Sequence, residues 1–441
     1  PQAYADDRLP YPDHGAVPVF PNEVTLPSAT GVTEHVYSAL AAKPAKPNVP
    51  YAGPAGFTLA PVSAKATITL SASPDSGWPT LRAFLAGTRH SLTVGLYDFT
   101  SQHVLTAVET SLAGKQVKFV LDHPPRNPTA DQTDEQTATA LATALGTHFE
   151  QAWALDRMDP LATAWTFPTA YHIKAAVRDG SAVWLSSGNW NNSNQPDIDP
   201  VTTPGDADAA RHGDRDWHVV IESVELASTF EAYLLNDLEV ARAHNASGAA
   251  SAPTPVAQGM QKTVTPPYAS FAPATTVTAT SWISPLLTPD PGVYTGAVKK
   301  LIESATTTLH LQFQYIELPK TASAVSAHFA ELVQAVIDRQ KAGVDVKVIM
   351  SEYETAGYLE QLQAAGLDVV NSVRIQNNVH NKGIVVDGTS VLVSSQNWST
   401  DGTLYNRDAG VIIHNAKAAG YFDSLFEHDW EHLARQKAAS D

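Results

Sequence analysis

The order of hydrophobic and polar positions along the chain predicts alternating strands and helices. From residue 64 onward, ATITLSA alternates as a half-buried strand does, and GWPTLRAFLAGT has the spacing of an amphipathic helix. SLTVGLYDF and QVKFVLDH are typical of buried strands, and the helical stretch HVLTAVETSLAG between them ends at Gly114. This rhythm predicts a largely parallel sheet covered by helices.

The same order returns later in the chain. YTGAVKKLIESA is helical in pattern, TLHLQFQYI strand-like, AHFAELVQAVIDRQKAG helical and VDVKVIM strand-like again. Two stretches rich in proline, alanine and small polar residues lack any such period. We therefore predict four regions: an N-terminal arm (1–63), a first half (64–245), a linker (246–269) and a second half (270–441).

A nineteen-residue pattern occurs in both halves. HIKAAVRDGSAVWLSSGNW runs from His172 to Trp190, and HNKGIVVDGTSVLVSSQNW from His380 to Trp398, an offset of 380 − 172 = 208 residues. Ten of the nineteen aligned positions are identical, where ordinary composition gives about one or two by chance. Downstream, RDWHVVIES from Arg215 matches RDAGVIIHN from Arg407. The chain is an internal duplication.

The repeated pattern places three polar groups near one another in each half. Residues i and i+2 of a strand share a face, so His172 and Lys174 point the same way. Asp179-Gly180 is a hairpin-turn signal, as is Asp387-Gly388, so each pattern predicts strand, tight turn, strand. The segment Ser-Ser-x-Asn-Trp then follows where the returning strand ends.

Two such copies facing each other fit the chemistry of a phosphodiester. Two ammonium groups and two amides can hold anionic oxygens and stabilise the charge that builds on phosphorus. One neutral histidine can attack phosphorus, and the other, protonated, can donate to the leaving oxygen. Both forms of histidine are accessible near neutral pH. A lone histidine on a strand is usually structural, but the duplicated spacing favours a functional pair.

Composition narrows the classes of partner. The formal charge of −17 disfavours broad coating of nucleic acid, while a local basic pocket can still hold one phosphate. Without cysteine there is no disulfide and no thiolate site. No run of eighteen apolar residues appears. Because the chain opens on Pro1 without a methionine, its start is either a processed end or an arbitrary boundary; a processed end suggests a secreted or periplasmic protein.

The two patterns resemble the signature of the phospholipase D superfamily, two H-x-K-x4-D motifs each followed by a small-residue pair and an asparagine. Ser186-Ser187 and Ser394-Ser395 stand where Gly-Ser is commoner. The resemblance implies a phosphodiesterase without metal or other cofactor that works through a phosphohistidine. It assigns the nucleophile to His172 and the general acid to His380, and implies the remaining site residues: Lys174, Lys382, Asn189 and Asn397 as phosphate ligands, Asp179 and Asp387 as residues that orient the catalytic side chains.

The fold class we predict is α/β: a bilobal pseudo-twofold duplication in which each half is a mixed β-sheet flanked by helices, with the active site at the interface of the halves. The expected substrate is a phospholipid head group, hydrolysed or transferred to an alcohol, and the expected state is a monomer. Two alternatives stay open, a metal-independent nuclease acting on single strands and a non-catalytic binding module. The aspartate-rich segment 197–216 is predicted to be a flap at the mouth of the site, with a metal site as the alternative.

Overall fold

The computed structural model describes residues 51–122, 130–155, 167, 170–244, 264–319, 323, 326–352 and 357–436. Most of the predicted arm and most of the predicted linker lie outside the described residues. In the first half the elements are β1 (Val62–Ser73), α3 (Gly77–Ala86), β2 (Ser91–Leu96), α4 (Gln102–Leu112), β3 (Gln116–Asp122), α5 (Asp134–Leu145), β4 (Phe149–Leu155), β5 (Lys174–Arg178), β6 (Ala182–Ser186), α6 (Ala207–Ala210), β7 (Asp216–Glu222) and α7 (Val224–His244).

The second half repeats this order after its own long strand. Its elements are β8 (Thr275–Thr288), α8 (Val293–Glu303), β9 (Thr308–Phe313), α9 (Ala327–Lys341), β10 (Asp345–Ser351), α10 (Tyr358–Ala365), α11 (Val369–Ser372), β11 (Val373–Gln376), β12 (Lys382–Val386), β13 (Ser390–Ser394), β14 (Asp408–His414) and α12 (Ala416–His432). Short 3-10 turns and one π-helical turn, Asp401–Tyr405, connect these elements. Each strand and helix named from the sequence pattern is present.

The described strands form one sheet, in which equivalent strands of the two halves follow in the same order from each edge to the centre. The order is β11-β10-β9-β12-β13-β14-β8-β1-β7-β6-β5-β2-β3-β4. In each half the outer three strands run parallel and the inner strands antiparallel. β1 and β8 pair antiparallel at the centre, with Ile68 opposite Val277. The predicted mixed α/β class is confirmed, and the two half-sheets are continuous through this central pair.

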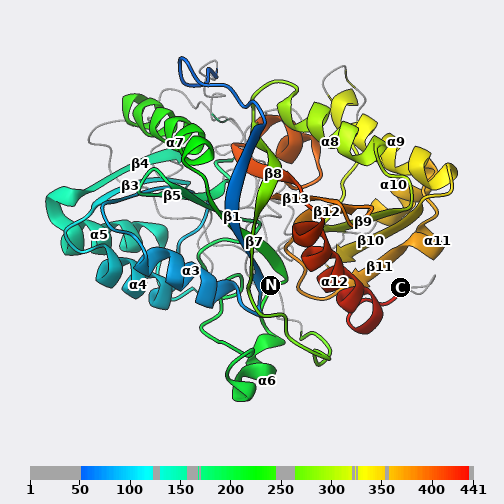
Figure 1. The fold of residues 1–441 in the computed structure, drawn as a ribbon, viewed down its shortest axis with the longest axis horizontal. Helices are drawn as coiled ribbons and strands as arrows, with labels where there is room; N and C mark the ends of the chain where they lie inside the picture. The colour runs from blue at the N-terminus through cyan, green and yellow to red at the C-terminus, as the bar shows by residue number, and fades with distance from the viewer. Residues whose placement is uncertain are drawn as a thin grey trace, which may run out of the picture.

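Helices cover the sheet with the same pseudo-twofold arrangement. In Figure 1, α7 lies to the upper left of the central strands and α12 to their lower right, and α3–α5 at the lower left lie opposite α8–α10 at the upper right. One buried cluster contains residues of both halves, among them Phe230 on α7 and Phe422 on α12. Trp217 of β7 stacks on Phe422 and packs so closely on Gly383 of β12 that a Cβ there would clash with its ring. The halves therefore share a core, and their relative placement is fixed by packing.

Two buried arginines connect the halves. Arg215 of the first half makes a bidentate ion pair with Asp429 of α12, at 2.8 and 2.9 Å, and contacts Asp75 at 2.7 Å. Arg407 of the second half pairs in the same way with Asp237 of α7. Burial by itself lowers the pKa of Arg215, but Asp429 and Asp75 raise that pKa well above the ordinary value. Each guanidinium is therefore held charged at the boundary between the halves.

Candidate active site

The two histidine–lysine pairs lie at the beginning of equivalent strands. β5 begins at Lys174 and β12 at Lys382, each two residues after its histidine. All four side chains are buried, with His172 the most exposed at 3%. Lys174 Nζ lies 2.7 Å from His172 Nε2, and Lys382 Nζ lies 2.9 Å from His380 Nε2. The shared strand face predicted from the i, i+2 spacing thus brings ammonium and imidazole into contact in both halves.

Each histidine is bound by an aspartate from the other half. His172 Nδ1 lies 2.9 Å from Asp408 Oδ1, and His380 Nδ1 lies 2.9 Å from Asp216 Oδ1. Both aspartates begin a strand, β7 or β14, next to the central pair of the sheet. Because neither half holds both members of a His–Asp pair, the site exists only where the halves meet.

Sequence reasoning missed this role of Asp216 and Asp408, although the repeated Arg-Asp pairs carried the signal. The sequence shows an Arg-Asp pair before a strand-like stretch in each half, at Arg215-Asp216 and at Arg407-Asp408. What the sequence cannot show is that each aspartate reaches across to the opposite histidine. In each pair the arginine binds the opposite terminal helix and the aspartate the opposite histidine.

The aspartates fix the protonated nitrogen of each imidazole. An ionised carboxylate only accepts hydrogen bonds, so Nδ1 carries the proton and donates it, and Nε2 faces its lysine. Burial alone raises the pKa of Asp216, but His380 and Lys382 hold that pKa below its ordinary value. Asp216 is therefore a carboxylate at neutral pH, which orients His380 and favours its protonated form.

The serine pairs that follow the returning strands support these aspartates. Ser187 donates to Asp216 at 2.7 Å, and Ser395 donates to Asp408. Ser186, which stands where glycine is commoner, contacts His218 Nδ1 at 2.6 Å and accepts the Gly188 amide. Burial lowers the pKa of His218 to about 4, so this imidazole is neutral. In the first half, therefore, the hydroxyl of Ser186 is hydrogen-bonded to the neutral, buried imidazole of His218.

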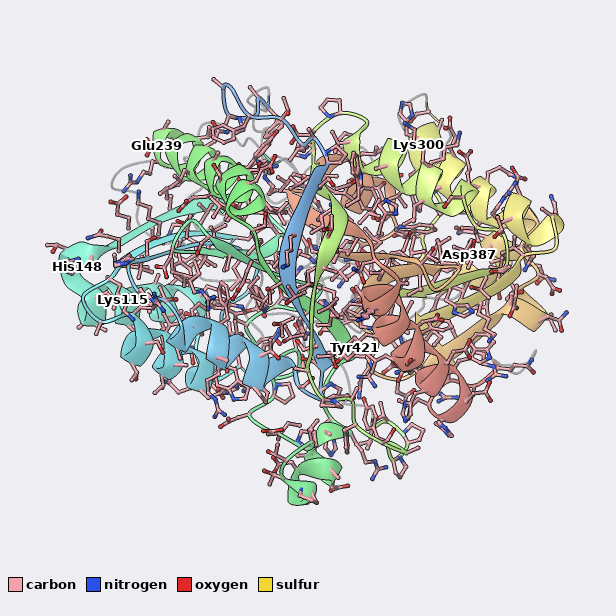
Figure 2. The ribbon with its side chains drawn as sticks, in the orientation of Figure 1. Lys115, His148, Glu239, Lys300, Asp387 and Tyr421 are labelled. Carbon is pink, nitrogen blue, oxygen red and sulfur yellow. The ribbon has the colours of Figure 1, made fainter. Side chains whose placement is uncertain are left out.

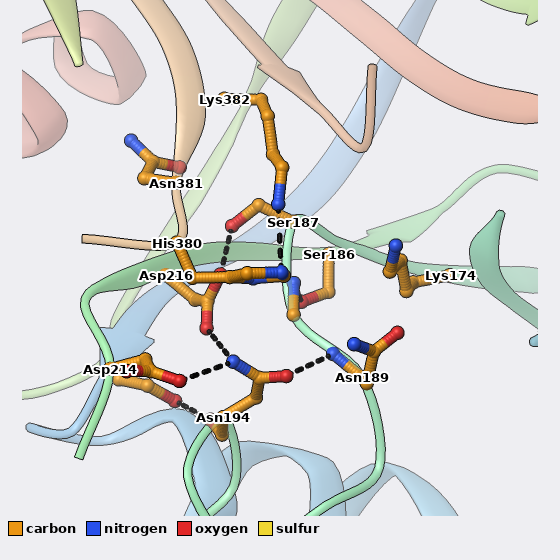
Figure 3. Close-up of polar contacts among 12 residues, drawn as sticks. Lys174, Ser186, Ser187, Asn189, Asn194, Asp214, Asp216, His380, Asn381 and Lys382 are labelled. Atoms are coloured by element: carbon orange, nitrogen blue, oxygen red, sulfur yellow. Dashed lines mark hydrogen bonds and ion pairs between the residues drawn. The ribbon is translucent and has the colours of Figure 1, made fainter. Parts of the chain in front are cut away.

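The two asparagines present amide atoms that lack a hydrogen-bond partner among the described residues. Both side-chain polar atoms of Asn189 are buried without a hydrogen bond, as is Asn397 Oδ1. Figure 3 shows Asn189 and Lys174 in the same close-up as His380 and Lys382. Buried amides left unsatisfied are costly unless a ligand completes them. This observation supports their predicted role as phosphate ligands.

Asp179 and Asp387 do not orient the catalytic side chains, and their predicted role is corrected here. Asp179, with φ of 55°, begins the turn at the far end of β5 from Lys174 and accepts the backbone amides of Arg89, His90 and Ser91. Asp387 holds the equivalent turn and binds residues 306–308. Figure 2 shows Asp387 in the outer part of the second half. Both residues stabilise a left-handed hairpin turn and the loop before the neighbouring strand.

We predict that Asp387→Asn lowers stability and leaves catalysis unchanged. Asparagine tolerates the left-handed backbone but lacks the charge that the amides of Thr307 and Thr308 stabilise. Those amides hold the pKa of Asp387 below its ordinary value despite partial burial. The stabilisation is therefore present above about pH 4, the unfolded pKa of Asp. Thermal melts should show a deficit of a few degrees at pH 7 that narrows below pH 4; a loss of kcat with unchanged stability would contradict this role.

The aspartates of segment 197–216 have separate partners. Asp197 accepts Trp78 Nε1, Asp199 accepts Thr202, and Asp206 accepts the backbone amide of Asp199. Across the described ranges, no group of three or more acidic or histidine side chains is arranged to hold a metal ion. In Figure 1, α6, which this segment contains, projects below the centre of the sheet. Within the same ranges, no helix has the length and apolarity needed to cross a membrane.

Comparison with known proteins agrees with the geometry. Residues 298–430, which include the second motif, match a family described as "Cardiolipin synthase, PLD-like domain". The mitochondrial cardiolipin hydrolase of Xenopus tropicalis is 32% identical over 103 residues, which are 23% of this chain and 49% of that protein. The family match and the curated relative support the predicted phospholipase D superfamily for this chain. Its alignment spans about half the length of that curated relative.

One solved structure supports the fold over most of the chain. The phosphatidylserine synthase of Haemophilus influenzae matches with a TM-score of 0.54 and 13% identity, over 83% of this chain and 87% of that one. Nuc of Salmonella typhimurium, a phospholipase D family member, matches with a TM-score of 0.30 and 23% identity, over 36% of this chain and 99% of its own. The prediction of an enzyme that acts on phosphodiester bonds is confirmed at the level of this superfamily.

Proposed function

We propose that the protein hydrolyses the phosphodiester of a phospholipid head group through a phosphohistidine. The observation that carries this proposal is the pair of crossed chains, Lys174–His172–Asp408 and Lys382–His380–Asp216. Each chain fixes one imidazole with Nδ1 bound and Nε2 available for chemistry. A two-step displacement on phosphorus needs two such groups, one to attack and one to transfer protons.

In the first step His172 Nε2 attacks phosphorus, and His380, protonated at Nε2, donates that proton to the leaving alcohol oxygen. The P–O bond breaks as the P–N bond forms. The new phosphoimidazole is cationic, and Asp408 stabilises it through Nδ1–H. With substrate present, the lysines turn from the imidazoles to the anionic phosphate oxygens, which Asn189 and Asn397 also bind.

In the second step neutral His380 takes a proton from water as the water oxygen attacks phosphorus. The P–N bond breaks, His172 is released neutral at Nε2, and the product is a phosphomonoester. An alcohol in place of water gives transfer of the phosphatidyl group by the same sequence. Neither step requires a metal ion, because the lysine ammonium groups and amide donors stabilise the phosphoryl charge.

The net charge and the relatives favour a phospholipid over nucleic acid. A chain with a formal charge of −17 repels a polyanionic strand at long range. The matching family is described by cardiolipin synthase, and the curated relative is a cardiolipin hydrolase. We therefore propose a glycerophospholipid substrate, with nuclease activity as the alternative outcome of the assay.

The assay offers the purified chain three substrates in the presence of EDTA. These are cardiolipin in mixed micelles, phosphatidylcholine in mixed micelles, and a short single-stranded oligonucleotide. We expect formation of phosphatidic acid from a phospholipid, no strand cleavage, and rates unchanged by EDTA. Added ethanol should divert part of the product to phosphatidylethanol. Strand cleavage without phosphatidic acid would contradict the lipid proposal, and loss of turnover in EDTA would contradict a metal-free mechanism.

A further inference from the structure

The two histidine–aspartate pairs, alike in sequence, differ in what supports the aspartate. Asp216 accepts three donors: His380 Nδ1 and Ser187 on Oδ1, and Asn194 Nδ2 on Oδ2 at 2.9 Å. Asp408 accepts His172 and Ser395 on Oδ1, while its Oδ2 is buried with no hydrogen bond from any residue that the structure describes. The difference comes from one side chain, Asn194.

Asn194 is wholly buried, and its side-chain amide bridges three parts of the site. Its Nδ2 donates to Asp216 and, at 3.0 Å, to Asp214, and its Oδ1 accepts the backbone amide of Asn189 at 3.0 Å. Figure 3 shows Asn194 at the centre of these contacts, between Asp214, Asp216 and Asn189. The same amide thus positions the aspartate behind His380 and the loop that carries a phosphate ligand.

The second half has no side chain in the equivalent place. If the offset of 208 residues between the two motifs is extended past Trp190, position 194 corresponds to Gly402, whose backbone amide donates to Ser399 as that of Asn194 donates to Asn191. A Cβ on Gly402 would clash with the carbonyl oxygen of Asn397. The tight packing keeps the position a glycine, and Asp408 therefore lacks a counterpart of the Asn194 amide.

We propose that Asn194 is a positioning residue that makes the two histidines unequal and, on the proposed function, tunes His380 as the proton donor. A carboxylate that shares its charge among three donors attracts the proton of its imidazole less strongly. His380 is therefore the more acidic of the two cations and gives its proton more readily to a leaving alcohol. Asp408, with one oxygen unshared, stabilises positive charge on His172 more fully, which suits a phosphohistidine.

Removal of the Asn194 amide should therefore raise the pKa of His380. The charged and titratable groups that face Asp216 and the groups next to it are His380, Lys382, His218, Arg215 and Asp214. In Asn194→Ala all of them remain, and one charged hydrogen bond to the carboxylate is lost. The imidazole signal of His380, followed by NMR in the full chain, should titrate roughly 0.5 to 1 unit higher than in the wild type. The His172 signal should not move.

Kinetics distinguish this role from a structural one. With a phospholipid, whose alcohol must be protonated as it leaves, the basic limb of the kcat–pH profile should move up with the pKa of His380. With bis(p-nitrophenyl) phosphate the leaving phenolate needs no proton. The rate constant of the nitrophenolate burst, which reports the first step alone, should therefore change less than about threefold. Asn194→Asp keeps an acceptor for the Asn189 amide and adds a carboxylate beside Asp214 and Asp216, so it should also move the basic limb upward while leaving KM closer to the wild type than Asn194→Ala does.

The outcomes separate this inference from the proposed function. An unmoved His380 titration in both variants, with folding intact by circular dichroism, would overturn the role of Asn194. Equal displacement of both histidine titrations would overturn it too, because the effect would then be general. Should the wild type cleave neither substrate, the proposed function fails, and the NMR titration still decides whether Asn194 sets the proton affinity of His380.

Discussion

Replacement of His172 by alanine is expected to abolish turnover of every phosphodiester that the protein accepts. The imidazole Nε2 is the atom that forms the bond to phosphorus, and the neighbouring Lys174 cannot replace it while it binds phosphate. Loss of a nucleophile that acts within such a unit costs roughly 10⁴-fold or more in kcat. The folded state should persist, because Asp408 keeps its contact with Ser395.

Replacement of His380 by alanine should instead separate the two chemical steps. With a phospholipid we expect a loss of roughly 10² to 10⁴, the usual contribution of a proton-transfer residue. With bis(p-nitrophenyl) phosphate we expect one equivalent of nitrophenolate in a burst, followed by stalling, because no group activates water for the second step. His432→Ala, at an exposed position on α12, is the matched control and should retain wild-type rates. A burst in His172→Ala and none in His380→Ala would reverse the two assignments.

The largest loss of stability is expected from Asp429→Ala. This carboxylate holds Arg215 in a bidentate pair and also accepts Gln312 at 2.8 Å, and both of these partners are buried. Its removal leaves a buried guanidinium with Asp75 as its remaining carboxylate partner among the described residues. Breaking one side of a buried ion pair typically costs about 3–5 kcal/mol. Urea unfolding, measured with the wild type, should show a loss of this size.

Asp208→Ala provides the matched control for that measurement. Asp208 pairs with Arg211 at 3.1 Å, but its side chain is 85% exposed. Exposed ion pairs contribute less than about 1 kcal/mol. Equal losses in the two variants would mean that the pairs joining the halves do not stabilise the fold more than a surface pair does.

Much of this fold can be predicted from the sequence, because the signals that begin and end each strand, helix and turn lie within a few residues of one another. Alternation within β1, helical spacing in α9 and the Asp-Gly turns each depend on neighbours a few residues apart, and the structure follows them. The continuous sheet could not be predicted, because the pairing of β1 with β8 depends on edges more than 200 residues apart.

The site was predictable as far as one half could define it. His172, Lys174 and Asn189 lie where a strand, a turn and a returning strand place them. The roles of Asp179 and Asp216 could not be separated by spacing, since both follow the histidine in the same half. Only the crossing of Asp216 to His380 in three dimensions assigns the orienting role to it, and only the contacts of Asn194 show that the halves are chemically unequal.

The central claim is a covalent intermediate on His172 at a site shared by the two halves. The most direct test is mass spectrometry of His380→Ala after reaction with bis(p-nitrophenyl) phosphate and an alkaline quench that preserves phosphoramidates. We expect one nitrophenylphosphoryl group on the peptide that contains His172, in an amount equal to the nitrophenolate burst. An adduct on another residue, or a burst with no adduct at all, would contradict it.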